Sequence, residues 1–497
     1  MKYYVGIDMG TQSMRGYLFD PEGELVAQAS SEYLPVYPQA GWAECDANLW
    51  LDALGHILAQ IKEQGRITAE DIGTIAFACI DASIVPVDEN CVPIDNCIIW
   101  MDSRTGEQAD RLRQRISEED ALTISGSPIT PFQDVTKIMW IRENKPEIYR
   151  KARYFCEATA FFVGYLTGTP VNGYCGASYT QLFDIRSRTW SETIFEAAEL
   201  DMDKMFEVRS AYEVAGTIRP QRAVEFGLSE HTRVVVGDSD HQIAMLGSGM
   251  KQPGQVMDIS GTSTSISTYI TKPVYDPVGT MLTHISADGR YWTLENASLI
   301  TGGNLRWYKD TLARCSYEEM DGAALSVAPG SDGLLFLPFL QGQITPAANS
   351  SARGVFFGLT MNHGLPQMTH AVYEANVFTI RDCIEVIRAS VGNPEVIIGT
   401  GGGTRSVLCN QMKADCLGIP FQVMESENAT GIGAGMLAGA AEGLFSTPED
   451  AIVRYVKKGR LYEPDPAKKS AYDEAYGAYL NCQASCQSLF ARYQSEA

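Results

Sequence analysis

The chain has 497 residues, with 61 acidic and 39 basic side chains and a formal net charge of −22. So acidic a composition argues against nucleic acid and anionic membranes as partners, because both are bound by clustered Lys and Arg. A chain of this length predicts two domains of about 250 residues, and its 45% hydrophobic and 20% charged residues are typical of a globular protein.

The sequence also argues against membrane insertion and zinc sites. Residues 1–20 do not resemble a signal peptide, and no apolar run reaches the roughly 18 residues of a membrane span. We therefore expect a cytoplasmic protein with no membrane partner. The twelve cysteines form no CxxC pair and the six histidines no HExxH motif, which predicts reduced, buried cysteines and no zinc site.

The first half of the chain alternates predicted strands and helices, which indicates an α/β protein. The predicted strands are rich in aromatic and β-branched residues and span 2–9, 14–20, 24–33, 74–80 and 96–100. A helix is predicted over 46–64, with Asp46 as its N-cap, and others near 103–116 and 136–144. Residues 232–249 predict a buried strand, an acidic turn and an apolar helix.

The pattern begins again near residue 256. Residues 255–270 give a strand, a Gly-Thr turn and a strand, so that Gly261 and Thr262 repeat Gly10 and Thr11 at close to half the chain length. This repeat predicts two similar domains, residues 1–250 and 251–497, with the boundary near 248–254.

The last part of the chain also reads as alternating elements. A strand, a glycine turn and a helix are predicted within 394–418, and a small-residue helix suited to close packing over 428–443. From Asp465 the tail has helical periodicity, with one side formed by Tyr472, Tyr476, Tyr479 and Leu480.

The Gly-Thr turns have the composition of phosphate-binding loops. The tip of a tight hairpin presents successive backbone N–H groups that bind anions. Glycine lets a ligand approach closely, and Thr and Ser hydroxyls add donors. Asp8, at the end of the first strand, is suited to hold Mg²⁺ against those phosphates. For one turn taken alone, an ordinary hairpin with a capping Thr is the alternative.

A third glycine turn, at 399–403, lies before a helix whose free N–H groups suit a phosphate or a flat base. Three such turns favour a nucleotide clamp. No Gly-Lys pair occurs, so there is no Walker motif, and Met436 replaces the third glycine of a dinucleotide fingerprint at 431–436. These departures disfavour an NAD-dependent oxidoreductase.

Eight stretches resemble, in order, the successive signatures of the FGGY carbohydrate kinases from residue 3 to about residue 445: GIDMGTQSMRGYLFD, GWAECDANLW, IIWMDSR, GDSDHQ, SGTSTS, GGNLRW, RGVFFGLT and GTGGGTRSVLCNQMKADCLGIP. The resemblance implies an α/β fold with two ribonuclease-H-like domains of the actin/Hsp70 ATPase superfamily flanking a central cleft. It also implies that ATP and Mg²⁺ bind in the cleft, with a small-molecule sugar or polyol deeper inside.

By this resemblance, Asp238 matches the family's general base, which receives the proton of the attacking hydroxyl. A helix N-cap is its alternative role. The metal candidates are Asp8 and Asp238. We assign no catalytic role to Asp240, and we expect packing or a supporting contact for His241.

The nucleotide-binding candidates lie in the three turns and in the GGNLRW stretch. They are Gly10, Thr11, Gln12, Ser13, Gly261, Thr262, Gly302, Leu305, Arg306, Gly401, Gly402, Gly403, Ser406 and Asn410. The alternative for Arg306 is a surface cation on a helix.

The substrate segment departs from that of the family. Residues 80–83 read IDAS, where xylulokinases have Gln-Met-His-Gly and glycerol kinases Asn-Gln-Arg-Glu. Because strong hydrogen-bond partners are lost, we expect a shifted substrate preference. The alternative role for Asp81 is that of a turn residue whose hydrogen bonds are satisfied within the protein. The alternative role for Asp102 is a structural ion pair with Arg104. The substrate candidates are Asp81, Ala82, Trp100, Asp102, Phe132, Asp238 and Ser239.

The function that these observations favour is ATP-dependent phosphorylation of a sugar hydroxyl, with a pentulose such as xylulose as substrate. A kinase of a polyol such as glycerol or erythritol is one alternative. A non-catalytic sensor that binds sugar and ATP is another. The sequence leaves open which hydroxyl is phosphorylated and whether the protein forms a homodimer.

Overall fold

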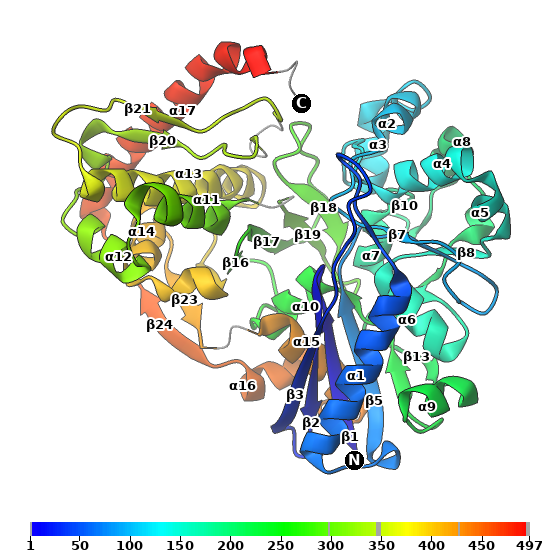
Figure 1. Ribbon diagram of the computed structural model, residues 1–497. Helices are drawn as coiled ribbons and strands as arrows, with labels where there is room; N and C mark the ends of the chain where they lie inside the picture. Colours follow the sequence, from blue (N-terminus) through cyan, green and yellow to red (C-terminus); the bar gives the residue numbers. More distant parts are fainter. Residues whose placement is uncertain (1, 297–298, 344–348, 426–427, 494–497) are drawn as a thin grey trace.

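Two β-sheets of matching topology form the frame of the molecule in the computed structural model, which describes residues 2–296, 299–343, 349–425 and 428–493 (Figure 1). From edge to edge, the first sheet consists of β13 (Val214–Thr217), β14 (Arg233–Val235), β5 (Ile72–Cys79), β1 (Tyr3–Met9), β2 (Ser13–Phe19) and β3 (Leu25–Glu32), with β15 (Asp238–Ser239) also beside β5. The second sheet consists of β18 (Leu282–Ile285), β19 (Trp292–Glu295), β17 (Thr264–Ile270), β16 (Gln255–Ser260), β22 (Val396–Thr400), β23 (Phe421–Met424) and β24 (Lys458–Tyr462).

The two sheets repeat one pairing pattern. β1 is antiparallel to β2 and parallel to β5, and β16 is antiparallel to β17 and parallel to β22. Each Gly-Thr turn therefore joins the same two strands of its sheet. This pattern confirms the predicted α/β fold with two ribonuclease-H-like units.

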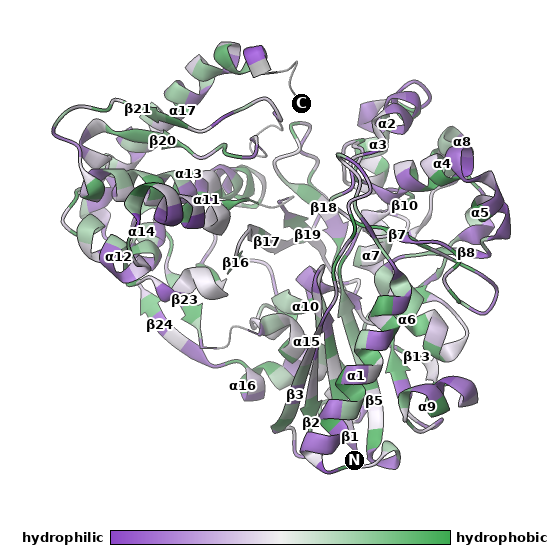
Figure 2. Ribbon diagram, in the orientation of Figure 1, coloured by the Kyte–Doolittle hydropathy of each residue, from purple (hydrophilic) through white to green (hydrophobic). Residues whose placement is uncertain are grey.

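The sequence of β1 explains how the first sheet is covered on both faces. Val5 and Ile7 lie in one hydrophobic core with Trp50 and Ile57 of α1 (Ala47–Gly65). Tyr4 points to the other face, into a core formed with α10 (Asp240–Gly247) and α15 (Ala429–Ala441), as the period of two residues along a strand requires. In Figure 2 this sheet is largely green, whereas the peripheral helices α2 (Gly106–Arg113) and α5 (Pro146–Lys151) carry many purple, hydrophilic residues.

The other elements complete the two lobes. The remaining helices are α3 (Glu118–Ser125), α4 (Asp134–Asn144), α6 (Ala158–Thr167), α7 (Tyr174–Tyr179), α8 (Glu192–Ala198), α9 (Pro220–Phe226), α11 (Thr301–Tyr308), α12 (Tyr317–Ala324), α13 (Leu365–Val391), α14 (Val407–Leu417), α16 (Ile452–Tyr455) and α17 (Lys469–Phe490). Short strand pairs are β4 (Glu44–Cys45) with β7 (Cys97–Ile98), β6 (Val85–Val87) with β8 (Tyr154–Cys156), β9 (Val171–Asn172) with β12 (Glu207–Val208), β10 (Phe183–Asp184) with β11 (Thr189–Trp190), and β20 (Leu335–Leu337) with β21 (Val355–Phe357).

Most predicted elements are present, with shorter bounds in places. The side chain of Asp46 caps α1 by accepting from the Asn48 N–H at 2.9 Å. The strand predicted over 96–100 is reduced to the two residues of β7, and the acidic turn at Asp238 instead pairs with β5 as β15. Of the residues expected on one side of α17, Tyr472 and Tyr479 are buried and Leu480 is 38% exposed.

The cysteines are as expected: all twelve are free thiols, ten of them buried. Among the described residues, no helix has both the length and the apolar character needed to cross a membrane.

Helix α15 crosses the predicted domain boundary. It follows most of the second sheet in the chain, yet it packs against the first sheet (Figure 1). Its glycines allow this contact, since a Cβ atom on Gly6 of β1 would lie 2.6 Å from the backbone nitrogen of Gly435. The division at residues 250 and 251 stays a prediction, and α15 shows that packing does not follow it strictly.

We predict that Gly6→Ala lowers the free energy of unfolding by about 1–3 kcal/mol, because the added methyl group overpacks the contact between β1 and α15. Urea denaturation would measure the change. Gly106→Ala is the matched control, since a Cβ atom there meets nothing within 4 Å, and its stability should equal or exceed that of the wild type. Wild-type stability of Gly6→Ala would contradict the packing described.

Candidate active site

Two aspartates share one row at the carboxyl edge of the first sheet. Asp8 of β1 and Asp238 of β15 are both paired with Ala78 of β5, which lies between them. Residues paired in register on parallel strands point to the same face, and adjacent strands are about 4.8 Å apart. The two carboxylates therefore flank a small side chain, with their Cα atoms about 10 Å apart.

The Asp238 carboxylate is buried and held by backbone N–H groups. It accepts from Gly176 at 2.8 Å and Cys175 at 3.1 Å, both in the first turn of α7, and from Ser239 at 2.9 Å. A Cβ atom on Gly173 would lie 2.0 Å from Asp238 Oδ2, so only glycine fits there. Burial raises the pKa of Asp238 to about 6, although these N–H groups oppose the shift.

Asp8 and Asp240 are carboxylates whose charge is poorly compensated. Burial raises the pKa of Asp8 to about 6, and the nearest cation, Arg15, is 3.6 Å away and half exposed. Burial and the charge of Asp8 raise the pKa of Asp240 to about 7. Two such oxygen donors at one end of the sheet suit a hard divalent cation such as Mg²⁺. Sequence analysis gave Asp240 no catalytic role and offered no signal for this pairing.

The segment after β5 is fixed by buried groups. The Asp81 carboxylate accepts from Ser239 Oγ, next to Asp238. Ala82 has a left-handed backbone with φ of 46°, a conformation that costs a non-glycine residue of the order of 1 kcal/mol. Glu157 accepts from the N–H groups of Ala82 and Ser83 at 3.0 and 3.2 Å, so the strained turn is anchored.

Lys137 completes this anchor from α4. Its side chain is fully buried, and its Nζ donates to the carbonyl oxygen of Ala82 and to Asp134. Sequence reasoning missed Lys137 and Glu157. A lysine on the apolar face of a predicted helix was a signal for the first, and nothing local pointed to the second.

Among the other substrate candidates, Trp100 and Phe132 are 41% and 46% exposed. Trp100 Nε1 donates to Thr11 Oγ1 at 2.9 Å, which joins this ring to the first Gly-Thr turn. Asp102 requires a correction: its side chain is fully buried, bonded to Arg104 at 2.6 Å and to the Ala43 N–H at 2.6 Å. This is the structural pair that the sequence analysis named as the alternative, and Arg104 and the Ala43 N–H occupy both carboxylate oxygens of Asp102.

Several nucleotide candidates line a single cavity in the second lobe. A Cβ atom on Gly302 would lie 2.0 Å from the carbonyl oxygen of Gly261, and one on Gly401 would lie 2.6 Å from that of Ser260. The glycine stretches thus converge at the end of β16. The lining residues are Ser260, Gly261, Thr301, Gly302, Leu305, Tyr373, Asn376, Val377, Ile380, Gly403, Cys409 and Lys413.

Lys413 is a charged residue of this cavity that sequence reasoning missed. Its Nζ lies 2.6 Å from Asp258 Oδ2 and 3.1 Å from Ser260 Oγ, and the pair is buried directly behind the second Gly-Thr turn. The ion pair ties α14 to β16, and so holds the cavity wall to the turn.

The remaining nucleotide candidates lie outside this lining. Arg306 is exposed on α11, as in the surface-cation alternative, and Gln12, Thr262 and Gly402 are exposed at the tips of their turns. Ser406 caps α14, with its Oγ accepting from the Cys409 N–H at 3.1 Å. Asn410 is buried, and its Nδ2 donates to the Thr404 carbonyl oxygen at 2.7 Å. In the first turn, the Gly10 N–H donates to the Ser13 carbonyl oxygen at 2.9 Å.

Two lobes with the same sheet, each with a phosphate-type turn after its first strand, define a two-domain ATPase fold of the actin and Hsp70 type. The N-terminal domain of the FGGY family of carbohydrate kinases matches residues 3–247, and the C-terminal domain of that family matches residues 256–442. The chain belongs to the FGGY family of carbohydrate kinases, and it is an ATP-dependent sugar kinase.

Similar proteins span almost the whole chain. A xylulose kinase of Lactococcus lactis is 28% identical over 96% of this chain and 95% of its own length. A gluconokinase of Bacillus subtilis is 29% identical over 94% of this chain and 93% of its own. A solved structure, ligand-bound xylulose kinase from Lactobacillus acidophilus, superposes with a TM-score of 0.93 at 24% identity, covering 99% and 100% of the two chains, and so shares the fold.

We predict that Asp240→Asn stabilises the protein at pH 8 but not at pH 4. The pKa of Asp240 is about 7 in the folded protein against 3.8 ordinarily, so the folded state binds more protons between these values and stability falls as pH rises through them. Asparagine avoids this loss. Because partial exposure screens the charge, we expect a gain of about 1–2 kcal/mol at pH 8.

Thermal unfolding without divalent cations at pH 4, 6 and 8 would measure the effect of Asp240→Asn. A change in Tm that is the same at all three pH values would contradict the assigned charge balance.

Proposed function

We propose that the protein transfers the γ-phosphate of ATP to a hydroxyl group of a pentulose such as xylulose. The observation that carries the proposal is the Asp238 carboxylate, buried at a sheet edge, fixed by three N–H groups, and with a pKa raised by burial to about 6. Such a group is a strong enough base at neutral pH and is rigidly aimed.

The substrate class follows from the charge around Asp238. Asp81 and Asp240 lie close enough to Asp238 and Asp8 to influence one another's ionisation. Carboxylates accept from the hydroxyls of a neutral sugar, whereas a sugar acid would bring a like charge into the same space. This favours the xylulose-type substrates named for several relatives over the gluconate named for another.

In the mechanism that we propose, the sugar hydroxyl donates to Asp238, which takes its proton as the oxygen attacks the γ-phosphorus in line. The bond between the γ-phosphorus and the oxygen that bridges the β- and γ-phosphates breaks, and ADP leaves with that electron pair. The N–H groups of the turns at Gly10 and Gly261 offset phosphate charge from the two lobes. Exclusion of water from between the lobes favours transfer to the sugar over hydrolysis.

Mg²⁺, when bound, neutralises part of the phosphate charge. Asp8 and Asp238 are the metal candidates from the sequence. Because both Asp238 oxygens already accept from N–H groups, we propose Asp240 as the partner of Asp8 and leave Asp238 to act as the base.

We predict that Asp238→Asn lowers kcat by about 10³-fold or more, because it removes the proton acceptor while keeping size and shape. ATP affinity, measured by calorimetry, should change little. Turnover would be followed by coupled release of ADP. An Asp238→Asn protein with wild-type turnover would exclude Asp238 as the base.

The pH dependence of kcat/KM should show the titration of Asp238 in the free enzyme. Its pKa is about 6, and only the ionised carboxylate accepts a proton. We therefore expect kcat/KM to rise as pH increases through about 6 and to fall about tenfold per unit below it. A rate independent of pH between 5 and 8 would argue against this assignment.

A screen of ketopentoses, polyols, aldonates and glycerol identifies the substrate. We expect ADP release to be fastest with a ketopentose and negligible with gluconate. Release with gluconate alone would overturn the charge argument, and no release with any sugar would favour a non-catalytic sensor.

A further inference from the structure

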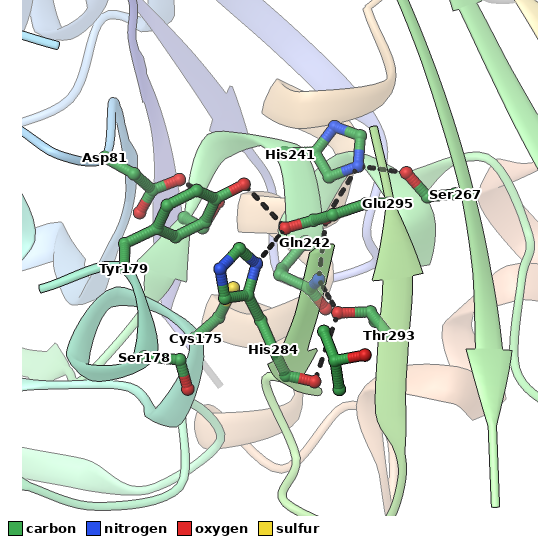
Figure 3. Close-up of polar contacts among 12 residues, drawn as sticks. Asp81, Cys175, Ser178, Tyr179, His241, Gln242, Ser267, His284, Thr293 and Glu295 are labelled. Atoms are coloured by element: carbon green, nitrogen blue, oxygen red, sulfur yellow. Dashed lines mark hydrogen bonds and ion pairs between the residues drawn. The ribbon is translucent and has the colours of Figure 1, made fainter. Parts of the chain in front are cut away.

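Glu295 is a buried carboxylate at the junction of the two lobes, and the sequence analysis did not single it out. It is the last residue of β19, and its side chain is 1% exposed. Figure 3 shows four side chains that point toward it. Glu295 Oε1 accepts from Tyr179 at 2.6 Å and bonds His284 Nδ1, and Oε2 lies 3.1 Å from His241 Nε2 and 3.4 Å from Gln242 Nε2.

Three of these four partners belong to α7, which bonds Asp238, and to α10, which follows Asp238 in the chain. Tyr179 ends α7, whose first turn donates two N–H groups to the Asp238 carboxylate. Four residues of helix separate Cys175 from Tyr179, about 6 Å along the axis. His241 and Gln242 lie in α10, which begins two residues after Asp238. Glu295 therefore joins the two helices on either side of that carboxylate.

The same network reaches the hairpin of the second Gly-Thr turn. His241 Nε2 also bonds Ser267 Oγ, on β17, and β17 begins directly after that turn. Gln242 Nε2 donates to Thr293 Oγ1 of β19 at 2.9 Å. The strands of the second sheet are thus bonded to the helix that follows Asp238.

The cluster has atoms that could ligate a metal, but its hydrogen bonds occupy them. Ligand atoms of Cys175, His284 and Glu295 lie within 4.8 Å of one another, all buried. His284 Nδ1 and Glu295 Oε1 bond each other, and His284 Nε2 lies 3.3 Å from Ser127 Oγ. We therefore treat the cluster as a hydrogen-bonded network around Glu295.

We propose that Glu295 is a positioning residue for Asp238. By bonding Tyr179 and His241 together, it keeps α7 and α10 in register, so that the N–H groups of Cys175 and Gly176 hold the carboxylate toward the space between the lobes. This inference rests on the proposed role of Asp238 as the base. A misplacement of the base by about 1 Å is enough to cost about a hundredfold in rate.

The test compares Tyr179→Phe and Glu295→Gln with the wild type. Tyr179→Phe removes one hydrogen bond, and Glu295→Gln keeps the shape of the side chain but loses both ion pairs. We expect kcat to fall about tenfold and about a hundredfold, respectively. The KM values for ATP and sugar should stay within about twofold, because neither Tyr179 nor Glu295 lines the nucleotide cavity.

Glu374→Gln is the matched control. Glu374, in α13, is a second buried glutamate beside a histidine: it accepts from Ser331 Oγ at 2.6 Å, and His370 Nδ1 is 3.6 Å away. The chemical change is the same, but the partners of Glu374, Ser331 and His370, lie outside the two helices beside Asp238. We expect Glu374→Gln to lower Tm by a similar amount and to leave kcat unchanged.

A double-mutant cycle with Asp238→Asn separates positioning from other roles. If Glu295 acts through Asp238, Glu295→Gln has no further effect on the residual turnover of Asp238→Asn. If the two residues act independently, the fold losses of kcat of the single variants multiply in the double variant. The inference is overturned if Glu295→Gln lowers Tm with no greater loss of kcat than Glu374→Gln, or if the two losses multiply. Wild-type turnover of Asp238→Asn would instead remove the proposed base itself.

Discussion

The site depends on a carboxylate, that of Asp238, buried among protein atoms. Burying the Asp238 charge carries a desolvation cost, and three N–H groups offset part of it. The offset is incomplete, as the pKa of about 6 shows. If the N–H groups offset the desolvation cost completely, the carboxylate would be too weak a base to take a proton. If they offset none of it, the carboxyl group would be protonated at neutral pH. Gly173 is part of this balance, because any side chain there would push the first turn of α7 away.

The twin sheets explain how one chain builds two half-sites from similar sequences. In each sheet the first strand pairs with a parallel strand and ends in a Gly-Thr turn, so each turn lies at a carboxyl edge. The first sheet adds Asp8 and Asp238 in one row across Ala78. The second adds a cavity, which Lys413 and Asp258 brace from behind. Helix α15, late in the chain, packs on the first sheet, so the lobes are not independent units.

Local patterns in the sequence predicted most of the strands, the Asp46 cap and the repeated turns, because each depends on neighbouring residues. They could not predict contacts that depend on register. Tyr179 and Glu295 are 116 residues apart in the chain, and Ala82 and Glu157 are 75 apart. Asp102 shows that a local pattern can also be ambiguous. The Trp-x-Asp-x-Arg spacing of residues 100–104 is compatible with Asp102 as a substrate ligand or as part of a buried ion pair. In the structure Arg104 packs against Trp42 and Trp140 and pairs with Asp102, which identifies the ion pair.

The buried carboxylates at the junction of the two lobes have different partners, and their pKa values differ for that reason. Burial raises the pKa of Asp8, Asp238 and Asp240, and the positive charges that oppose the shift do not offset it: Arg15, half exposed, beside Asp8 and His241 beside Asp240. Glu295 is equally buried, yet His241 and His284 hold its pKa below the usual range against that burial. A carboxylate held by two histidines stays ionised and serves to hold helices together. Carboxylates whose partners do not offset burial remain able to take a proton or a divalent cation, and they lower the stability of the folded protein as pH rises from 3.8 to their raised pKa values of about 6 to 7. The same fold thus places an ionised structural carboxylate, Glu295, near Asp238, the carboxylate that we propose accepts a proton.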